Sequence, residues 1–258
     1  MLTFATVFTV VAAPAFASFG MLMGDRWRSE RPTADYLRDI AIRPSTCDGC
    51  AAPVRPWALT PIFGWWFAGG KCACKKLRLT PFYFIIETLA LLFALAAVRL
   101  YGDLAWTFLP AIAGMTAAAR SDYRTREVHE SAWALIWLSA ALFLFQTPDP
   151  LSHLATPAIF LGLFLPICFL YLKMGRIPAI PMGDFFLIAG LTAFLDMDRG
   201  ILFAAALIPA ILIVAMSPKG GMPFLPKAPA LAYAAAAALL APHATIAALE
   251  KAISALVG

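Results

Sequence analysis

The sequence predicts an all-α polytopic membrane protein. It would have about eight transmembrane helices and a small cytoplasmic Cys-rich loop domain between helices 1 and 2. Of its 258 residues, 62% are hydrophobic and only 14% are charged, and the mean hydropathy is +0.80. A soluble domain is about 45–50% apolar and about 25% charged. Apolar runs of roughly membrane-spanning length recur along the chain. The lipid bilayer is therefore an expected partner, and the formal charge of +5 bears on topology rather than on a nucleic-acid partner.

The first apolar run, residues 2–23, is interpreted as an uncleaved membrane anchor that makes 1–23 the first transmembrane helix. Its end, Ala15-Phe16-Ala17-Ser18, resembles a signal-peptidase site, so a cleaved signal stays as the alternative. However, no Lys or Arg precedes Arg26, and the positive n-region of a signal peptide is missing. We therefore expect the N-terminus on the outer side.

Residues 24–81 form the only long polar segment, and the rest of the chain, 82–258, is read as one transmembrane domain. Its apolar runs predict seven more spans, at 82–100, 104–120, 132–146, 154–173, 184–197, 200–216 and 225–241. A last stretch, 245–257, is interrupted by Glu250 and Lys251, which is typical of an amphipathic helix on the membrane surface.

The distribution of positive charge predicts which side each loop faces. With the N-terminus outside, the inner loops are 24–81, 120–131, 173–183 and 217–227, and they hold 17 of the 20 Lys and Arg residues. Inner loops of membrane proteins carry this excess. The segment 24–81 is therefore expected in the cytoplasm.

Two aspartates lie on this cytoplasmic side, at the ends of two predicted spans. Asp122 ends the third span and Asp184 begins the sixth, directly after Gly183. Ionisable residues at a membrane boundary are costly and often functional. Two close carboxylates do not readily ionise together, so one keeps its proton while the other acts as a base. Such a pair can activate water against an amide bond and protonate the leaving nitrogen.

Structural roles for these aspartates stay open at this point. Each could cap a helix end or pair with one of the nearby cations, Arg120, Arg124 or Arg126. A proton or cation transporter would use two such acids as well, although transporters commonly show paired, interrupted segments in their two halves. The chain shows no such symmetry. A catalytically silent membrane scaffold is the third class.

Four cysteines in the polar segment predict a second site. Cys47-x-x-Cys50 and Cys72-x-Cys74 fall in a loop expected in the cytoplasm, where disulfides are disfavoured. Two thiolate pairs at this spacing suit a tetrahedral structural Zn²⁺. The alternative is a set of reduced thiols without metal.

Six segments, in the correct order, resemble the type IV prepilin peptidases, which are aspartic membrane proteases of the GxGD type. In chain order the matching segments are Arg43-Pro44-Ser45-x-Cys47-x-x-Cys50, Thr60 to Trp65, Gly70-Lys71-Cys72, Pro81 to Glu87, Ser121 to Val128 with Gly183-Asp184, and Met222-Pro223-Phe224. This resemblance covers nearly the whole chain.

The resemblance implies a two-step enzyme of the prokaryotic cytoplasmic (inner) membrane. On the scaffold alternative, the chain would bind pilin-like helices without cleaving them. An aspartic endopeptidase would cut the basic leader from prepilins or pseudopilins of type IV pilus or type II secretion systems, with Asp122 and Asp184 as the catalytic pair. The Cys-bearing segment 24–81 would be a zinc-binding, methylation-associated domain that helps to methylate the new N-terminal amine from S-adenosylmethionine. By the same resemblance, Gly70 and Glu87 are candidates for the methylation site.

The sequence departs from the family at four places. Pro181 replaces the first glycine of G-x-G-D, and His129 replaces a proline after the first aspartate segment. Phe186 stands where many members have a lysine, and the second cysteine pair is C-x-C rather than C-x-x-C. Both aspartates are in place, so protease activity is still the expectation.

Overall fold

The computed structural model describes residues 3–28, 32–47, 50, 52–71, 81–125, 127–173, 182–196, 198–200, 203 and 235–241. Secondary structure in this part of the chain is helical, apart from isolated bridge residues at Thr46 and Pro53, which pair in an antiparallel bridge, and at Lys71. In chain order the helices are α1 (Phe4–Arg26), α2 (Thr33–Ile42), η1 (Pro56–Leu59), α3 (Phe63–Phe67), α4 (Phe82–Tyr101), η2 (Gly102–Phe108), α5 (Leu109–Thr125), α6 (Glu130–Gln146), α7 (Pro150–Lys173) and α8 (Met182–Thr192). The prediction of an all-α protein is confirmed for these residues.

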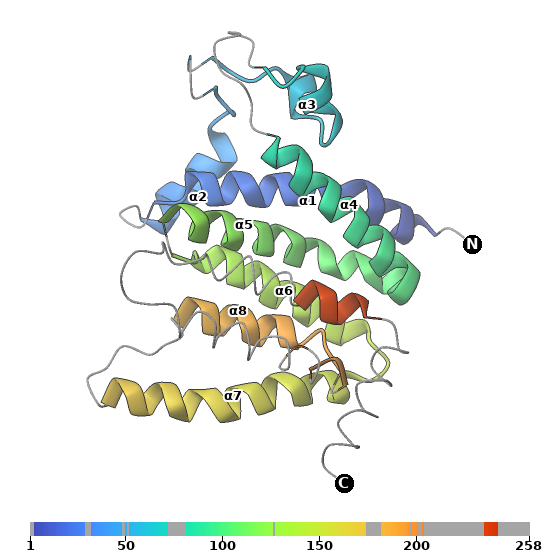
Figure 1. Cartoon of the computed structure of the whole chain (residues 1–258), viewed down its shortest axis with the longest axis vertical. Coiled ribbons are helices and arrows are strands. Elements are labelled where there is room, and N and C mark those ends of the chain that lie inside the picture. Colours follow the sequence, from blue (N-terminus) through green and yellow to red (C-terminus); the bar gives the residue numbers. More distant parts are fainter. Residues whose placement is uncertain are drawn as a thin grey trace.

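The long helices stack side by side in an order that differs from the order in the chain. Figure 1 shows α1, α5, α6, α8 and α7 as successive layers, while α4 crosses α1 and the segment with α3 rises above them. Helix α5 is thus packed between α1 and α6. This order places the end of α5, which carries Asp122, between the N-terminal helix and the helix pair α6/α8.

Helix α1 approaches α5 closely because small residues line their interface. Ala13 and Ala17 are fully buried on α1. A Cβ added at Gly20 would overlap Thr116 and the carbonyl of Ala113, and one added at Gly24 would lie 2.6 Å from the Cβ of Arg120. Small residues of this kind let membrane helices pack backbone to backbone. The close contact at Gly24 brings the next residue, Asp25, within reach of α5.

Three phenylalanine rings hold η2, α6 and the turn after α8 together, away from Asp122 and Asp184. Phe108 lies 5.5 Å from Phe143 and 5.2 Å from Phe194 between ring centroids, and Phe143 lies 5.6 Å from Phe194. All three are buried. Tilted ring contacts at these distances stabilise a core beyond the burial of their area.

Two helical stretches of the described chain are long and apolar enough to cross a membrane. One is Phe4–Arg26, and the other is the continuous stretch Phe82–Thr125, which includes α4, η2 and α5. Helix α6 is apolar but shorter. The predicted spans at 2–23, 82–100, 132–146 and 154–173 coincide closely with α1, α4, α6 and α7. Only residues 200 and 203 of the seventh predicted span and 235–241 of the eighth are described, and the surface tail lies outside the described residues, so the number of spans stays a prediction.

Two predicted boundaries differ from the structure. Helix α8 ends at Thr192 rather than at 197, where the N–H groups of Phe194 and Leu195 donate to the carbonyls of Leu191 (3.2 Å) and Thr192 (3.1 Å) and form a turn. Asp196 then accepts a bond from the backbone N–H of Arg199 (2.9 Å) and caps a new helical turn. Helix α5 continues past 120 to Thr125 and begins after η2, which follows directly on α4. The segment 24–81 also contains a helix, α2, which apolar runs did not reveal since only Tyr36 is buried on it.

Candidate functional site

Asp122 lies in the last turn of α5 and is buried, with 8% of its surface exposed. Its neighbour Ser121 is fully buried. A carboxylate buried at this depth has to be hydrogen-bonded or paired. Asp122 therefore sits inside the protein at the end of a helix, as the sequence predicted, rather than in a solvated loop.

The backbone of Asp184 lies in the first turn of α8, whereas its side chain is outside the described part of the structure. A Cβ added at the preceding Gly183 would lie 3.4 Å from the Cβ of Val128, in the connection between α5 and α6. Figure 1 shows α5 ending on the side of the molecule at which α8 begins. The chain segments that carry the two aspartates thus meet at one end of the helix stack.

Helix α8 packs against α6, and this contact holds the start of α8 near the end of α5. The indole N–H of Trp137 donates to the carbonyl oxygen of Phe186 (3.1 Å), and the ring of Trp133 stacks on that of Phe186 (5.4 Å). Phe186, which stands where many family members have a lysine, therefore has a packing role here. Pro181, the other departure near Asp184, lies outside the described residues.

Two of the three arginines that might have paired with the aspartates bind a different carboxylate. Asp25, at the end of α1, accepts a bond from Nε of Arg120 (2.7 Å) and one from Nη1 of Arg124 (2.8 Å). It also accepts a bond from the hydroxyl of Tyr83 on α4 (2.7 Å). Sequence reasoning missed Asp25 and Tyr83, since nothing local distinguishes one acid in a basic loop.

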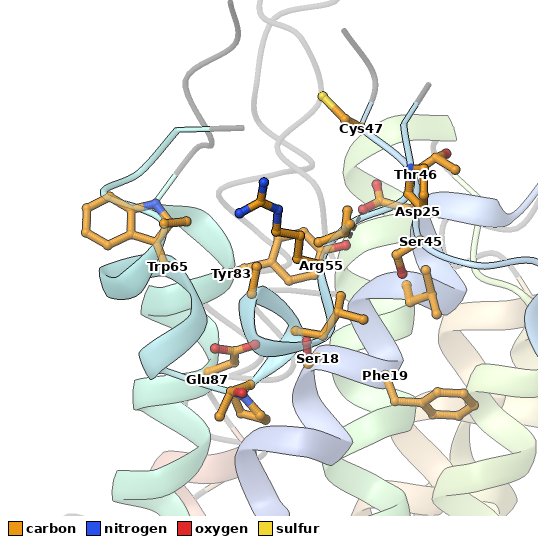
Figure 2. Close-up of a pocket in the computed structure, with 18 of the residues that line it drawn as sticks. Ser18, Phe19, Asp25, Ser45, Thr46, Cys47, Arg55, Trp65, Tyr83 and Glu87 are labelled. Atoms are coloured by element: carbon orange, nitrogen blue, oxygen red, sulfur yellow. Dashed lines mark hydrogen bonds between the residues drawn. The ribbon is translucent and has the colours of Figure 1, made fainter. Parts of the chain in front are cut away.

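A cavity of about 1190 Å³ lies between α1, α4 and the segment that carries η1 and α3. Figure 2 shows Glu87 and Tyr83 on its α4 side, Ser18 at its α1 wall and Arg55 above them. Its charged lining residues are Asp25, Arg26, Arg28, Asp39, Arg43, Arg55, Lys71, Glu87, Arg120 and Arg124. Basic side chains thus outnumber the three carboxylates, and the lining of the cavity is positively charged overall.

Glu87 holds a strained turn at the floor of this cavity. Its Oε2 accepts a bond from the backbone N–H of Ile62 (2.5 Å), and only 7% of Glu87 is exposed. Ile62 has φ 65° and ψ −55°, and the N–H of Phe63 donates to the carbonyl of Pro61 (2.7 Å). This is a γ-turn of the rare positive-φ type. Backbone strain of this kind persists where the surroundings impose it, and it gathers at functional sites.

Gly70 lies against the ring of Trp65 in the same region. It has φ 64°, and its N–H donates to the carbonyl of Trp65 (3.1 Å). A Cβ there would lie 3.1 Å from the indole ring of Trp65, which lines the cavity. Both sequence-predicted methylation candidates therefore shape one cavity, Glu87 as a lining residue and Gly70 as a support for Trp65.

The part of the chain that surrounds this cavity is similar to a known domain family. Residues 11–101 match the sequence model of the bacterial peptidase A24 N-terminal domain. We refer to residues 11–101 below as the A24 N-terminal domain after this match. The match supports a type IV prepilin peptidase and so confirms the resemblance seen in the motifs. No curated protein matches, and no solved structure matches.

The A24 N-terminal domain extends over α1, the cavity segment and α4, and so includes Glu87, Gly70 and Asp25. Asp122 and Asp184 lie beyond the matched residues. The domain boundaries predicted at 23 and 81 both fall inside the match and stay predictions.

The first cysteine pair of the A24 N-terminal domain sits in a tight turn. The N–H of Cys50 donates to the carbonyl of Cys47 (3.4 Å), and the N–H of Cys47 donates to the carbonyl of Ala52 (2.9 Å). Cys47 is buried and Cys50 is exposed. Two thiols presented by one turn fit half of a tetrahedral zinc site.

The second pair, Cys72 and Cys74, lies outside the described residues. Within the described part of the chain no group of three or more His, Cys, Asp or Glu side chains is placed to hold a metal ion. The four-cysteine zinc site is therefore still a prediction.

His129, the departure at the family's proline, links the A24 N-terminal domain to α6. Its Nδ1 accepts a bond from the N–H of Ser131 (3.1 Å) and so caps α6. Its ring lies 3.6 Å from that of Trp27 and 4.4 Å from that of Tyr36, between centroids. Burial raises the pKa of Tyr36, whose hydroxyl donates to the carbonyl of Met23 (3.0 Å). The histidine thus fills a space between the ends of α1 and α2.

Burial lowers the pKa of His129 to about 4, so we expect it to make the protein sensitive to acid. Between that value and about 6.5 the unfolded chain binds a proton at His129 that the folded chain does not. The stability that neutral His129 contributes to the folded protein is present above about pH 6.5 and is lost as the pH falls toward 4. From about pH 7.5 to about pH 5, the free energy of unfolding should fall by about 2 kcal/mol through this residue.

The measurement is unfolding of the detergent-purified protein at the two pH values. The matched variant is His129→Phe, which keeps a ring between Trp27 and Tyr36 but has no titrating group. The free energy of unfolding of this variant should fall by about 2 kcal/mol less than that of the wild type over the same pH range. An equal acid sensitivity in the variant would show that His129 is not the group responsible.

Proposed function

We propose that this protein is a prepilin peptidase of the cytoplasmic membrane that uses Asp122 and Asp184 as its catalytic pair. The single observation that carries the proposal is the buried carboxylate of Asp122 at the end of the stack where α8, with Asp184, begins. The engagement of Arg120 and Arg124 with Asp25 favours it further, because two nearby cations already have a carboxylate partner. The family match of the N-terminal domain supports a prepilin-type substrate.

The chemistry would follow from two carboxyl groups in different protonation states. The ionised one takes a proton from a water molecule as the water oxygen bonds to the scissile carbonyl carbon. The protonated one donates its proton to the carbonyl oxygen, which balances the charge of the tetrahedral intermediate. When the intermediate collapses, the C–N bond breaks, the amide nitrogen takes the proton that the first carboxyl group gained from water, and one hydroxyl of the intermediate returns a proton to the second carboxylate. The products are the basic leader and a pilin with a free N-terminal amine.

We also propose that the cavity of the A24 N-terminal domain serves N-methylation of that amine. The residues present fit S-adenosylmethionine by their chemistry: Trp65 offers a ring for the adenine, Arg55 a guanidinium for the carboxylate, and Glu87 a negative charge for the sulfonium. When bound, this cofactor supplies a methyl group. A structural Zn²⁺ at Cys47, Cys50, Cys72 and Cys74 would hold the cavity segment in shape.

Co-expression with a prepilin, in cells without a prepilin peptidase of their own, tests this function. Mass spectrometry of the pilin N-terminus reports both steps, because cleavage removes the leader and methylation adds the mass of one CH₂ unit as a methyl group replaces a proton. We expect a cut and methylated product. A precursor that stays uncut but co-purifies with the protein would instead identify a pilin-binding scaffold.

A further inference from the structure

Asp25 is the meeting point of three helices. It lies in the last turn of α1 and follows Gly24, where the absence of a side chain lets α1 approach Arg120 on α5. Its Oδ1 accepts bonds from Arg120 and Arg124, and its Oδ2 accepts the bond from Tyr83 on α4. Nη1 of Arg124 also donates to the main-chain carbonyl of Asp25 (2.7 Å). One carboxylate thus ties α1, α4 and α5 to one another.

These contacts are partly sheltered from solvent. The side chain of Asp25 is 22% exposed, and those of Arg120 and Arg124 are 23% and 34% exposed. Ion pairs that are fully exposed contribute little. A pair that shares one acceptor with a second arginine and a tyrosine hydroxyl is held in one geometry, because each donor restricts the others.

The two arginines flank Asp122 in sequence. Residues four apart lie one turn apart on the same face of an α-helix, so Arg120 and Arg124 share a face. Asp122, two residues from each, is turned about 200° away from Arg120 around the helix axis, toward the other side. Holding both arginines on α1 therefore fixes the rotation of the last turn of α5 and with it the direction of Asp122.

We propose that Asp25 is a positioning residue for the peptidase reaction, which it serves by fixing the turn of α5 that carries Asp122. The inference rests on the proposed function of Asp122. The same network would also serve the methylation site. The cavity proposed for methylation is lined in part by Asp25, Tyr83, Arg120 and Arg124. Without Asp25, two arginines beside Asp122 lose their counter-charge, and the helix end loses its link to α1.

The test is steady-state cleavage by the purified full-length protein of a synthetic prepilin peptide with a basic leader, a phenylalanine after the cut and an apolar helix. Asp25→Asn removes the charge and keeps the size, and Asp25→Glu restores the charge. We expect kcat of Asp25→Asn, per folded molecule, to fall between about tenfold and a hundredfold, because small displacements of a catalytic group have effects of this size. KM should change less than about twofold, since a positioning residue acts through Asp122 and not through contact with the peptide. Asp25→Glu should recover much of the loss.

Asp196→Asn is the matched control. It breaks an ion pair of similar length, to Arg199 (3.0 Å), with an acid that is 31% exposed, beyond the far end of α8. Its kcat should equal that of the wild type. Arg124→Gln removes a second member of the same network and should also lower kcat. Combined with Asp25→Asn it should cause no further loss, because both changes break the same contact.

An Asp25→Asn protein with wild-type kcat, or with a change in KM alone, would overturn the inference. So would a loss that the Asp196→Asn control shares. The proposed function fails separately, since it requires Asp122→Asn to be inactive whatever Asp25→Asn does.

Discussion

Replacement of either Asp122 or Asp184 by asparagine is expected to abolish leader cleavage, while the protein still inserts into the membrane. Asparagine keeps the size of the side chain but cannot accept and return a proton. General acid–base catalysis contributes about 10²–10⁴-fold in rate, so each single variant should lose at least about a hundredfold. Because the two groups would act as a unit, the double variant should be little worse than either single one.

Asp103→Asn is the control for this prediction. Asp103 accepts a bond from the hydroxyl of Thr3 and lies in the first turn of η2, next to the start of α1 and far along α5 from Asp122. Cleavage is followed by the change in mass of a prepilin peptide. Substantial activity of Asp122→Asn or of Asp184→Asn would remove that residue from the catalytic pair.

Loss of the first cysteine pair should remove methylation and leave cleavage in place. Cys47→Ser with Cys50→Ser takes two of the four proposed ligands from the segment that walls the cavity. A structural Zn²⁺ acts by folding the segment that holds it, and the proposed cleavage chemistry needs only the carboxylates at the ends of α5 and α8. We expect about one zinc per wild-type chain, less in the variant, and a product that is cut but not methylated.

Cys168→Ser, in α7, is the control for loss of a thiol outside the A24 N-terminal domain. Zinc is measured on the purified proteins, and the pilin N-terminus by mass spectrometry. Loss of cleavage together with methylation would mean that the segment also supports the peptidase. A wild-type protein without zinc would mean that the C-x-C spacing does not hold the metal.

The helices and the placement of the aspartates could be read from the sequence because both depend on local patterns. Apolar runs predicted α1, α4, α6 and α7 closely, and charge counting placed Asp122 and Asp184 on one side. The early end of α8 could not be read in this way. The apolar run continues through Leu195, and only the hydrogen bond from Arg199 to Asp196 shows that a new turn starts there.

The network around Asp25 depends on contacts between residues distant in sequence. Asp25 is 95 residues from Arg120 and 58 from Tyr83. Nothing in the basic loop marks Asp25 until α1 and α5 are packed together. The strained turn at Ile62 was hidden for the same reason, since its partner Glu87 lies on another helix. Sequence motifs identified Glu87 but not what it holds.

The most direct test of the central claim, that Asp122 and Asp184 face each other across α5 and α8, is cross-linking. The five native cysteines are first replaced. Asp122→Cys and Asp184→Cys are then combined and treated in membranes with a short thiol-specific cross-linker. Asp122→Cys with Asp196→Cys is the control pair, with the second thiol beyond the far end of α8. The first pair should cross-link within one chain and the control should not. Failure of the first pair to cross-link, while both thiols react with a monofunctional reagent, would contradict the account.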